Sequence, residues 1–203
     1  MVPFALEGLG RVDLALGDAA AAEQQFEKLI ADDKYGTMWT LRGKLGKARA
    51  LSAQGAGEKG LKLAEQVMKA ASQPGLFDLR SQAEDARTEL LFAAGRYEEV
   101  RKIYRHLAES APEHDTVAKA KAYNAIGDAY FAENKIKEAV LAYLRVRVLY
   151  PDNREQLAYA LYGAARGFTA MKRSREASEL MFILEEKHPE SIWTAKAKAE
   201  LGD

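Results

Sequence analysis

The sequence contains no cysteine among its 203 residues, which excludes disulfide bonds, thiolate metal ligands and cysteine nucleophiles. It also lacks an excess of either charge, because 30 lysines and arginines balance 30 aspartates and glutamates. A neutral chain does not have the long-range attraction on which nucleic-acid binders and polybasic membrane anchors depend. We therefore expect no nucleic acid partner.

Long hydrophobic runs are also missing. The longest apolar run, residues 157–165, is far shorter than the ~20 residues that a helix needs to cross a bilayer. The opening MVPFALEG has neither the basic start nor the apolar core of a secretory signal. We expect no direct membrane insertion. Either the protein stays in the cytoplasm, or this chain is a trimmed piece of a longer protein.

Alanine is abundant, with 37 residues against 14 valines and isoleucines together. Alanine has the smallest free-energy penalty in a helix, whereas β-branched residues favour strands. The composition therefore predicts an all-α chain.

An internal repeat organises this helical chain. Five stretches carry small or apolar residues at i, i+4 and i+7, which is one stripe of a helix. Their first members lie 38 to 40 residues apart and are Ala22, Gly60, Val100, Ala139 and Ala177. Each stretch follows another helical segment and a short turn, and four of them precede a proline that stops the helix. The turns contain Gly17, Gly55, Gly95, Asn134 and Lys172, and the prolines are Pro74, Pro112, Pro151 and Pro189. Each repeat predicts a hairpin of two helices.

Residues 122–151 resemble a tetratricopeptide repeat. This segment reads AYNAIGDAYFAENKIKEAVLAYLRVRVLYP. It has small, aromatic and apolar residues and a final proline at the positions where that family has them. These residues are Tyr123, Ile126, Gly127, Tyr130, Ala139, Tyr143, Val146 and Pro151. The resemblance implies an α-solenoid of about five antiparallel hairpins in a right-handed superhelix. The expected units are 3–36, 39–74, 77–114, 118–153 and 156–190, with a terminal helix at 191–203, as one solenoid over residues 1–203.

Two details of this repeat are specific to the chain. Aligning Gly46 with the helix-packing residue of the second unit requires about two extra residues in its internal turn. Both ends of the chain fall inside a repeat, so we expect a fragment of a longer protein. The unit endings LYPDN and KHPES resemble those of tetratricopeptide proteins of the Gram-negative cell envelope, such as the Tol-Pal-associated ones, which favours a bacterial periplasm or envelope, with the cytoplasm as the alternative.

Candidate chemistry is sparse. GAGEKG, residues 55–60, has the glycine spacing of a dinucleotide-binding loop, but no β-strand precedes it, so we interpret it as a turn between helices. Glu185 and His188 have a metal-site spacing that occurs only once, so we expect a solvated histidine at a helix end. We expect no catalytic residue, cofactor or metal, and therefore no enzyme.

The resemblance implies a function instead, because the first helices of such hairpins line a concave groove that binds an extended peptide or a partner helix. The residues expected to face this groove, by offset from the packing position, are Glu7, Arg11, Leu14, Lys47, Asp85, Glu89, Phe92, Lys121, Asn124, Asp128, Phe131, Tyr159, Tyr162 and Arg166. Glu7 and Arg11 stand where carboxylate-clamp members have lysine and asparagine, so this set of groove-facing residues differs from theirs. We expect Phe92, Phe131, Tyr159 and Tyr162 to be exposed anchors, or alternatively to pack against a neighbouring hairpin.

The sequence therefore predicts a non-enzymatic scaffold that binds a protein or peptide. One alternative is a structural segment that self-associates through its terminal repeats. Another is the regulatory arm of a larger protein whose active domain lies outside this chain.

Overall fold

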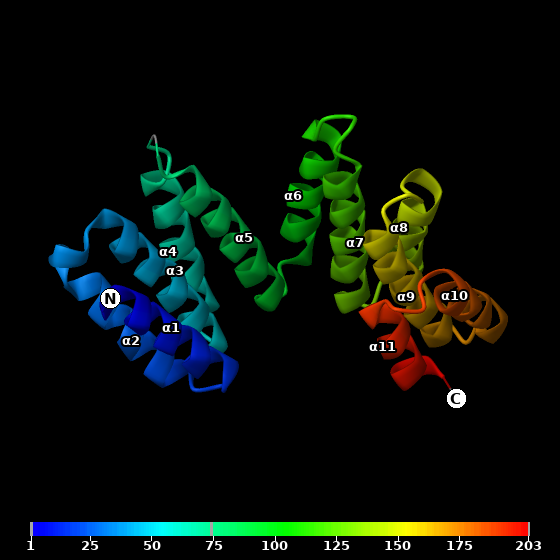
Figure 1. Cartoon of the computed structure of the whole chain (residues 1–203), viewed down its shortest axis with the longest axis horizontal. Helices are drawn as coiled ribbons and strands as arrows, with labels where there is room; N and C mark the ends of the chain where they lie inside the picture. Colours follow the sequence, from blue (N-terminus) through cyan, green and yellow to red (C-terminus); the bar gives the residue numbers. More distant parts are fainter. Residues whose placement is uncertain (1, 74, 203) are drawn as a thin grey trace. The chain divides into compact units, whose positions relative to one another are not determined.

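The structure, a computed structural model, describes residues 2–73 and 75–202 (Figure 1). All secondary structure in this part of the chain is helical, which confirms the all-α prediction. The first six elements are α1 Val2–Ala15, α2 Ala19–Ala31, a short 3-10 helix η1 Asp33–Tyr35, α3 Thr37–Ala53, α4 Gly57–Ala70 and α5 Phe77–Ala93. The remaining elements are α6 Tyr97–Ser110, α7 Thr116–Ala132, α8 Ile136–Leu149, α9 Arg154–Ala170, α10 Ser174–Lys187 and α11 Ile192–Leu201.

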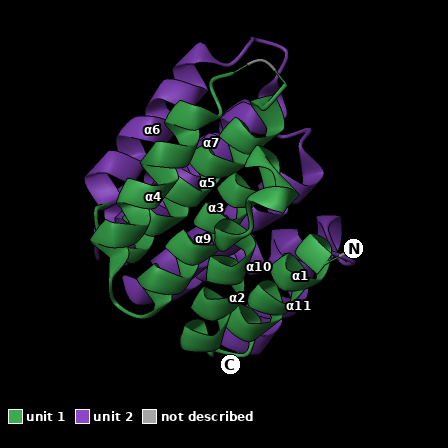
Figure 2. Cartoon of the chain, turned by 90° about the vertical axis from the view of Figure 1, so that its left-hand side faces the viewer, with its two compact units in different colours: residues 1–96 green, residues 97–203 purple. Residues whose placement is uncertain are grey.

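The helices form two compact units, Met1–Arg96 and Tyr97–Asp203 (Figure 2). Within each unit every helix packs on the next one along the chain. The odd-numbered helices also contact each other, α1 with α3 and α3 with α5 in the first unit, and α7 with α9 and α9 with α11 in the second. This consecutive packing, with a row of first helices in each unit, is the arrangement of an α-solenoid.

Four of the expected hairpins pair neighbouring helices within one compact unit, α1 with α2, α3 with α4, α7 with α8 and α9 with α10. The two helices of the expected third unit, α5 and α6, belong to different compact units. A single solenoid over residues 1–203 and the right-handed superhelix therefore stay predictions. Pro112, Pro151 and Pro189 each follow the end of a helix, whereas Pro74 lies outside the described residues.

The turn inside each hairpin contains one residue in the left-handed conformation. These residues are Gly17 (φ 83°), Gly55 (82°), Gly95 (72°), Asn134 (61°) and Lys172 (59°). After α7, the Lys135 amide donates to the Tyr130 carbonyl at 2.9 Å, the long backbone bond that closes a helix C-terminus around such a residue. The predicted turn residues are therefore confirmed, and GAGEKG supplies Gly55 to one of these turns.

The second hairpin is as regular as the others, which corrects its expected register. Its turn, residues 54–56, has the same length as residues 133–135 in the fourth hairpin, so it contains no insertion. Gly57 and Gly60 lie in α4 rather than in the turn. The packing position twelve residues before Gly60 is Ala48, not Gly46, and a side chain at Gly60 would lie 2.5 Å from the Ala48 carbonyl oxygen. The correct register is therefore two residues later than Gly46.

A repeated contact fixes the spacing of the first helices. The ring of Phe26 on α2 occupies the space that a Cβ would fill at Gly10 on α1 and at Gly46 on α3, and either Cβ would lie less than 3.0 Å from the ring. The ring of Tyr143 on α8 does the same at Gly127 on α7 and at another glycine on α9. Both rings are almost fully buried. Each ring is thus held between two first helices whose glycines leave room for it.

The helices α6 and α7 are joined by a buried charge. The Arg101 side chain is 2% exposed and pairs with Glu98 on its own helix at 2.7 Å and with Glu133 at the end of α7. Its guanidinium also lies 4.3 Å from the centre of the Tyr130 ring. Because a buried guanidinium is tolerated only when it is paired, these contacts fix how α6 lies on α7.

We predict that Gly127→Ala lowers the free energy of unfolding by about 1–3 kcal/mol, because its Cβ would overpack the Tyr143 ring. The matched control is Gly8→Ala on α1, where the added Cβ would meet nothing within 4 Å apart from the local backbone of its own helix. That change should be neutral or should stabilise by up to about 1 kcal/mol, as alanine is the better helix former. Urea denaturation followed by circular dichroism compares the two, and equal effects would contradict the packing argument.

Candidate functional site

Every residue that the sequence places in a binding groove lies on an odd-numbered helix. Glu7, Arg11 and Leu14 lie on α1, Lys47 on α3, Asp85, Glu89 and Phe92 on α5, Lys121, Asn124, Asp128 and Phe131 on α7, and Tyr159, Tyr162 and Arg166 on α9. The set is divided between the two compact units. The two groups are therefore described separately.

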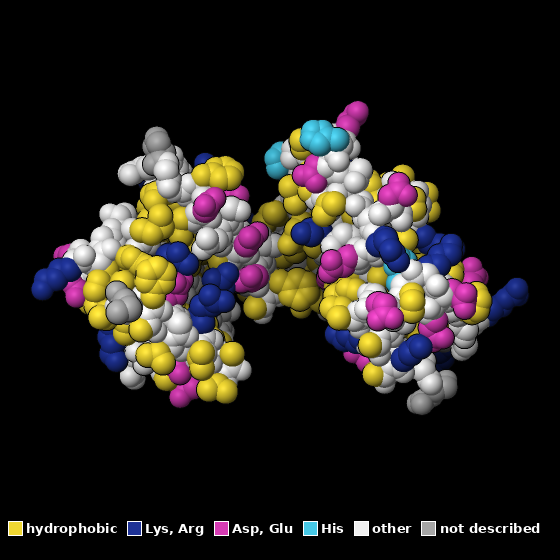
Figure 3. All heavy atoms as spheres, viewed as in Figure 1, with side chains coloured by type: hydrophobic (Ala, Val, Ile, Leu, Met, Phe, Trp, Pro, Cys, Tyr) yellow, Lys and Arg dark blue, Asp and Glu magenta, His cyan; other side chains and the backbone are white. Residues whose placement is uncertain are grey.

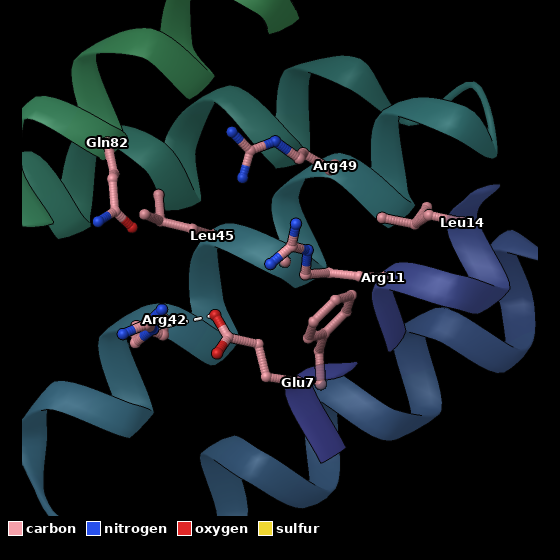
Figure 4. A pocket seen from close by; sticks show the side chains of 9 residues that line it. Glu7, Arg11, Leu14, Arg42, Leu45, Arg49 and Gln82 are labelled. Atoms are coloured by element: carbon pink, nitrogen blue, oxygen red, sulfur yellow. Dashed lines mark hydrogen bonds and ion pairs between the residues drawn. The ribbon is translucent and has the colours of Figure 1, made fainter. Parts of the chain in front are cut away.

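In the first unit a pocket of ≈ 400 Å³ opens between the first helices (Figure 4). Three of the predicted residues line it together, Glu7, Arg11 and Leu14 of α1. The rest of its wall comes from Phe26 of α2, from Arg42, Leu45, Gly46 and Arg49 of α3, and from Gln82 of α5. The pocket therefore spans three successive first helices, α1, α3 and α5.

Ion pairs orient two of the arginines in this pocket. Arg42 Nε donates to Glu7 Oε1 at 2.9 Å, and its guanidinium lies 5.2 Å from the centre of the Trp39 ring. Arg49 Nε donates to Glu89 Oε2 of α5, also at 2.9 Å. Both contacts join neighbouring first helices, α1 with α3 and α3 with α5, and orient the two guanidinium groups.

Arg11 differs from these two arginines. It is exposed, and within residues 2–73 and 75–202 it has no ion-pair partner. The pocket lining has three arginines and one glutamate, so its net charge is positive. Such a site can bind a carboxylate or another anion through charge-assisted hydrogen bonds.

The other predicted residues of the first unit lie outside the pocket lining. Lys47 pairs with Glu23 at 3.3 Å and with Glu27 at 2.5 Å, both on α2, and the hydrogen bond to Glu27 raises the pKa of Lys47. Asp85 is exposed and Phe92 is half-buried. Lys47 thus ties α3 to α2, and the expectation that it faces the same space as Glu7 and Arg11 is not met.

The register correction explains which pocket residues the sequence reasoning missed. Arg49 stands one residue after Ala48, the same offset that Arg11 has from Gly10. Arg42 and Gln82 stand six residues before the packing positions Ala48 and Thr88, as Lys121 does before Gly127. The repeat alone therefore identifies Arg49 as a pocket residue. Lys47 was predicted in its place because Gly46, rather than Ala48, was aligned as the packing position.

In the second unit Asp128 is the centre of a hydrogen-bond network. The Tyr143 and Tyr159 hydroxyls each donate to Asp128 Oδ1 at 2.7 Å. Burial raises the pKa of Asp128 above its ordinary value, although both hydrogen bonds act in the opposite direction. Burial also raises the pKa of both tyrosines. The network joins α7, α8 and α9 and is already satisfied internally.

The helix α11 covers the aromatic residues of α9. Trp193 stacks on Tyr162, with ring centres 5.6 Å apart, and meets Tyr159 edge-on at 4.4 Å. The Tyr162 hydroxyl donates to Glu200 at 2.6 Å. Tyr162 is only 2% exposed, and burial raises its pKa to about 12. The expectation that Tyr162 is an exposed anchor is wrong, and the alternative of packing on the next helix describes it.

Phe131 and Arg166 form a second contact between α7 and α9. The Arg166 guanidinium lies 4.5 Å from the centre of the Phe131 ring and 3.9 Å from Glu200 of α11. Both residues are half-buried. Their outer surfaces stay accessible, so they remain candidates for contact with a partner.

Two polar residues of α7 have opposite environments. Asn124 is 3% exposed, and its amide nitrogen donates to the Gln156 carbonyl oxygen of α9 at 3.0 Å. Its Oδ1 is buried without a hydrogen-bond donor among the described residues. Lys121, one turn earlier, is exposed. Asn124 therefore contributes to helix packing, whereas Lys121 is free to meet a ligand.

Possible metal ligands are not clustered in the part of the chain that the structure describes. Within the described residues, no group of three or more histidine, aspartate and glutamate side chains could hold an ion. His188 is buried rather than solvated, which corrects that expectation, and burial lowers its pKa. Among the same residues no helix has both the length and the apolar character needed to cross a membrane.

The fold and these sites define a helical repeat protein, and one stretch of the chain matches a known repeat family. Residues 120–152 match the family model described as tetratricopeptide repeat. No curated protein matches the chain at a significant level. The cell-envelope subtype suggested by the unit endings finds no support in these matches.

Two solved structures are similar over nearly the whole chain. One is a crystal structure of nearly identical TPR-like repeats from a Podosopora anserina protein described as a kinesin light chain, with 17% identity, a TM-score of 0.65, and coverage of 96% of this chain and 94% of that one. A crystal structure of a single-residue variant of those repeats has 18% identity, a TM-score of 0.64, and coverage of 96% and 93%. The likeness shows a TPR-like fold. Repeats of this kind generally mediate protein–protein interactions.

We predict that Asp128→Asn raises the free energy of unfolding relative to that of the original chain, and that this gain grows as the pH rises. The pKa of Asp128 is raised in the folded state, so the folded chain holds this proton more tightly than the unfolded chain does. Its contribution to stability is therefore lost as the pH rises from about 4 through the raised pKa. The asparagine oxygen can still accept from both tyrosines.

Urea midpoints at several pH values between 4 and 7 measure this effect. The difference in free energy of unfolding between Asp128→Asn and the original chain should grow with pH, by about 1.4 kcal/mol in total for each unit by which the pKa is raised. Asp85→Asn, at an exposed position of α5, is the control and should show no such trend. A difference that is constant with pH would show that Asp128 ionises normally.

Proposed function

We propose that this chain is a non-enzymatic scaffold that binds a protein partner, as an extended peptide or a helix, along the surface of its odd-numbered helices. The observation that carries the proposal is the pocket of the first unit. It lies between α1, α3 and α5, and it brings together Glu7, Arg11 and Leu14. Its wall crosses three successive first helices, as a polypeptide lying across them requires.

The second unit supports the same proposal in a more limited way. Its aromatic residues Tyr159 and Tyr162 are occupied by contacts with α11, so they are not free anchors. The exposed Lys121 and the half-buried Phe131 remain on the surface of the first helices. The face shown in Figure 3 has acidic, basic and apolar side chains interspersed on each unit. A partner with mixed chemistry fits such a surface better than a uniformly charged polymer.

Charge reversal on the first helices tests this proposal. Random 16-residue peptides displayed on phage are selected on the original chain, and the affinity of the enriched peptides is then measured for the variants. We predict that Lys121→Glu or Asp85→Lys changes the affinity of enriched peptides by about fivefold or more, because like charges across an interface repel.

The matched controls reverse exposed lysines on second helices, Lys62→Glu on α4 and Lys102→Glu on α6, and should leave the affinity unchanged. Two outcomes would refute the proposed function: the selection enriches no peptide, or the controls and the first-helix variants have the same effect.

Self-association is a second candidate function, favoured by the outer surface of α1. Val2, Leu9, Val12 and Leu16 are each more than half exposed and follow one stripe of that helix and its end. A second copy that placed the same stripe against this one would bury these side chains in an isologous contact.

For this candidate, sedimentation velocity over a wide concentration range should detect a dimer. We predict that Leu9→Glu raises its dissociation constant by about tenfold or more, which corresponds to about 1.4 kcal/mol. Leu141→Glu, at a still more exposed leucine of α8, should have no effect. A monomer at every concentration would exclude self-association.

A further inference from the structure

The arginines of the first-unit pocket are unequally satisfied. Arg42 and Arg49 each use Nε to bind a glutamate, at 2.9 Å in both cases. A guanidinium has five N–H donors, so each of these arginines retains terminal N–H groups that a ligand can reach. Arg11 has no acidic partner within the described part of the chain. The pocket therefore has more positive charge and more donors than its own carboxylates satisfy.

The position of these groups matters as much as their number. Figure 4 shows the Arg11 side chain reaching from α1 towards α3, between Glu7 and Arg49. Gln82 of α5 lies on the same opening and adds an amide. Planar guanidinium groups bind carboxylates through paired N–H donors, which gives a preference for orientation as well as charge.

The pocket wall also has an apolar part. Phe26 and Leu45 are buried beneath the charged groups, and Leu14 is half-buried at the edge. Phe26 cannot withdraw, because its ring is held between Gly10 and Gly46. Methylene groups of a ligand side chain can therefore pack on this wall while its charged end meets the arginines.

We infer that this pocket binds a glutamate or aspartate side chain within an extended acidic segment of a partner protein. The inference rests on the proposed function and names the chemistry that the first-unit site selects. Charge complementarity favours an internal segment over a chain end, because the positive groups are distributed over α1 and α3 and one terminal carboxylate would meet only part of them. Arg11 is the specificity residue, since it is the only arginine of the pocket lining whose charge has no glutamate partner among the described residues.

A pool of random octapeptides, acetylated and amidated so that neither end is charged, tests the inference. The peptides that the original chain retains are sequenced and compared with the input pool. We expect glutamate and aspartate to be enriched about threefold or more, because each replaces water at an already positive site. Arg11→Gln should remove most of this enrichment, and Arg11→Lys should retain part of it.

Two controls separate the inference from its alternatives. Lys62→Gln removes an exposed cation of α4 and should leave the enrichment unchanged. A second pool with free C-termini shows whether the site prefers a terminal carboxylate. Circular dichroism verifies that each variant is folded, which is expected because Arg11 and Lys62 are exposed.

Several results would overturn the inference. One is a retained pool without acidic enrichment, and another is equal enrichment by the original chain and Arg11→Gln. A third is acidic enrichment that occurs only at free C-termini. In each of these cases peptides still bind, so the proposed function stands. A pool from which no peptide is retained contradicts the proposed function itself.

Discussion

The packing of the helices depends on side-chain size at the points where the second helix of a hairpin contacts two successive first helices. Where the second helix provides a ring, Phe26 or Tyr143, the two first helices provide glycines, and an added Cβ on any of those glycines would lie less than 3.0 Å from the ring. At the same register of the second hairpin the residues are Ala48, Ala64 and Ala86, all fully buried. The second helix thus packs on two successive first helices in two ways, through one ring with two glycines or through three alanines.

The sequence of the third hairpin departs from this size rule. At the corresponding register it has Thr88 on α5 and Tyr104 on α6, a ring without a glycine on its own first helix. A branched threonine side chain leaves less room for a ring than a glycine does. The boundary between the two compact units falls between these residues, after Arg96. Within its own unit α6 is secured to α7 by the buried Arg101, so its position there depends on paired charge as well as on apolar packing.

Much of this fold could be predicted from the sequence, because hairpin formation depends on local signals. The positive φ angles at Gly17, Gly55, Gly95 and Asn134 follow from residues that tolerate that conformation. The site was predicted less well for two physical reasons. One misplaced glycine shifted the register by two residues, which replaced Arg49 by Lys47. The burial of Tyr162 depends on Trp193 and Glu200, which lie more than thirty residues away and approach it only after α11 packs.

The same packing explains why the two units differ as binding surfaces. On α9 the aromatic and charged groups that could anchor a partner are used internally, because α11 brings Trp193 and Glu200 to them. On α1 and α3 the pairing is incomplete, since Glu7 and Glu89 satisfy Arg42 and Arg49 and leave Arg11 unpaired in the described structure. A buried and satisfied network stabilises the fold but has few unpaired hydrogen-bonding groups left for a ligand. An exposed, unpaired charge destabilises the fold little and can be neutralised by a partner. The proposed binding of a partner is therefore favoured at the first unit, where the buried Phe26 ring also lines the pocket.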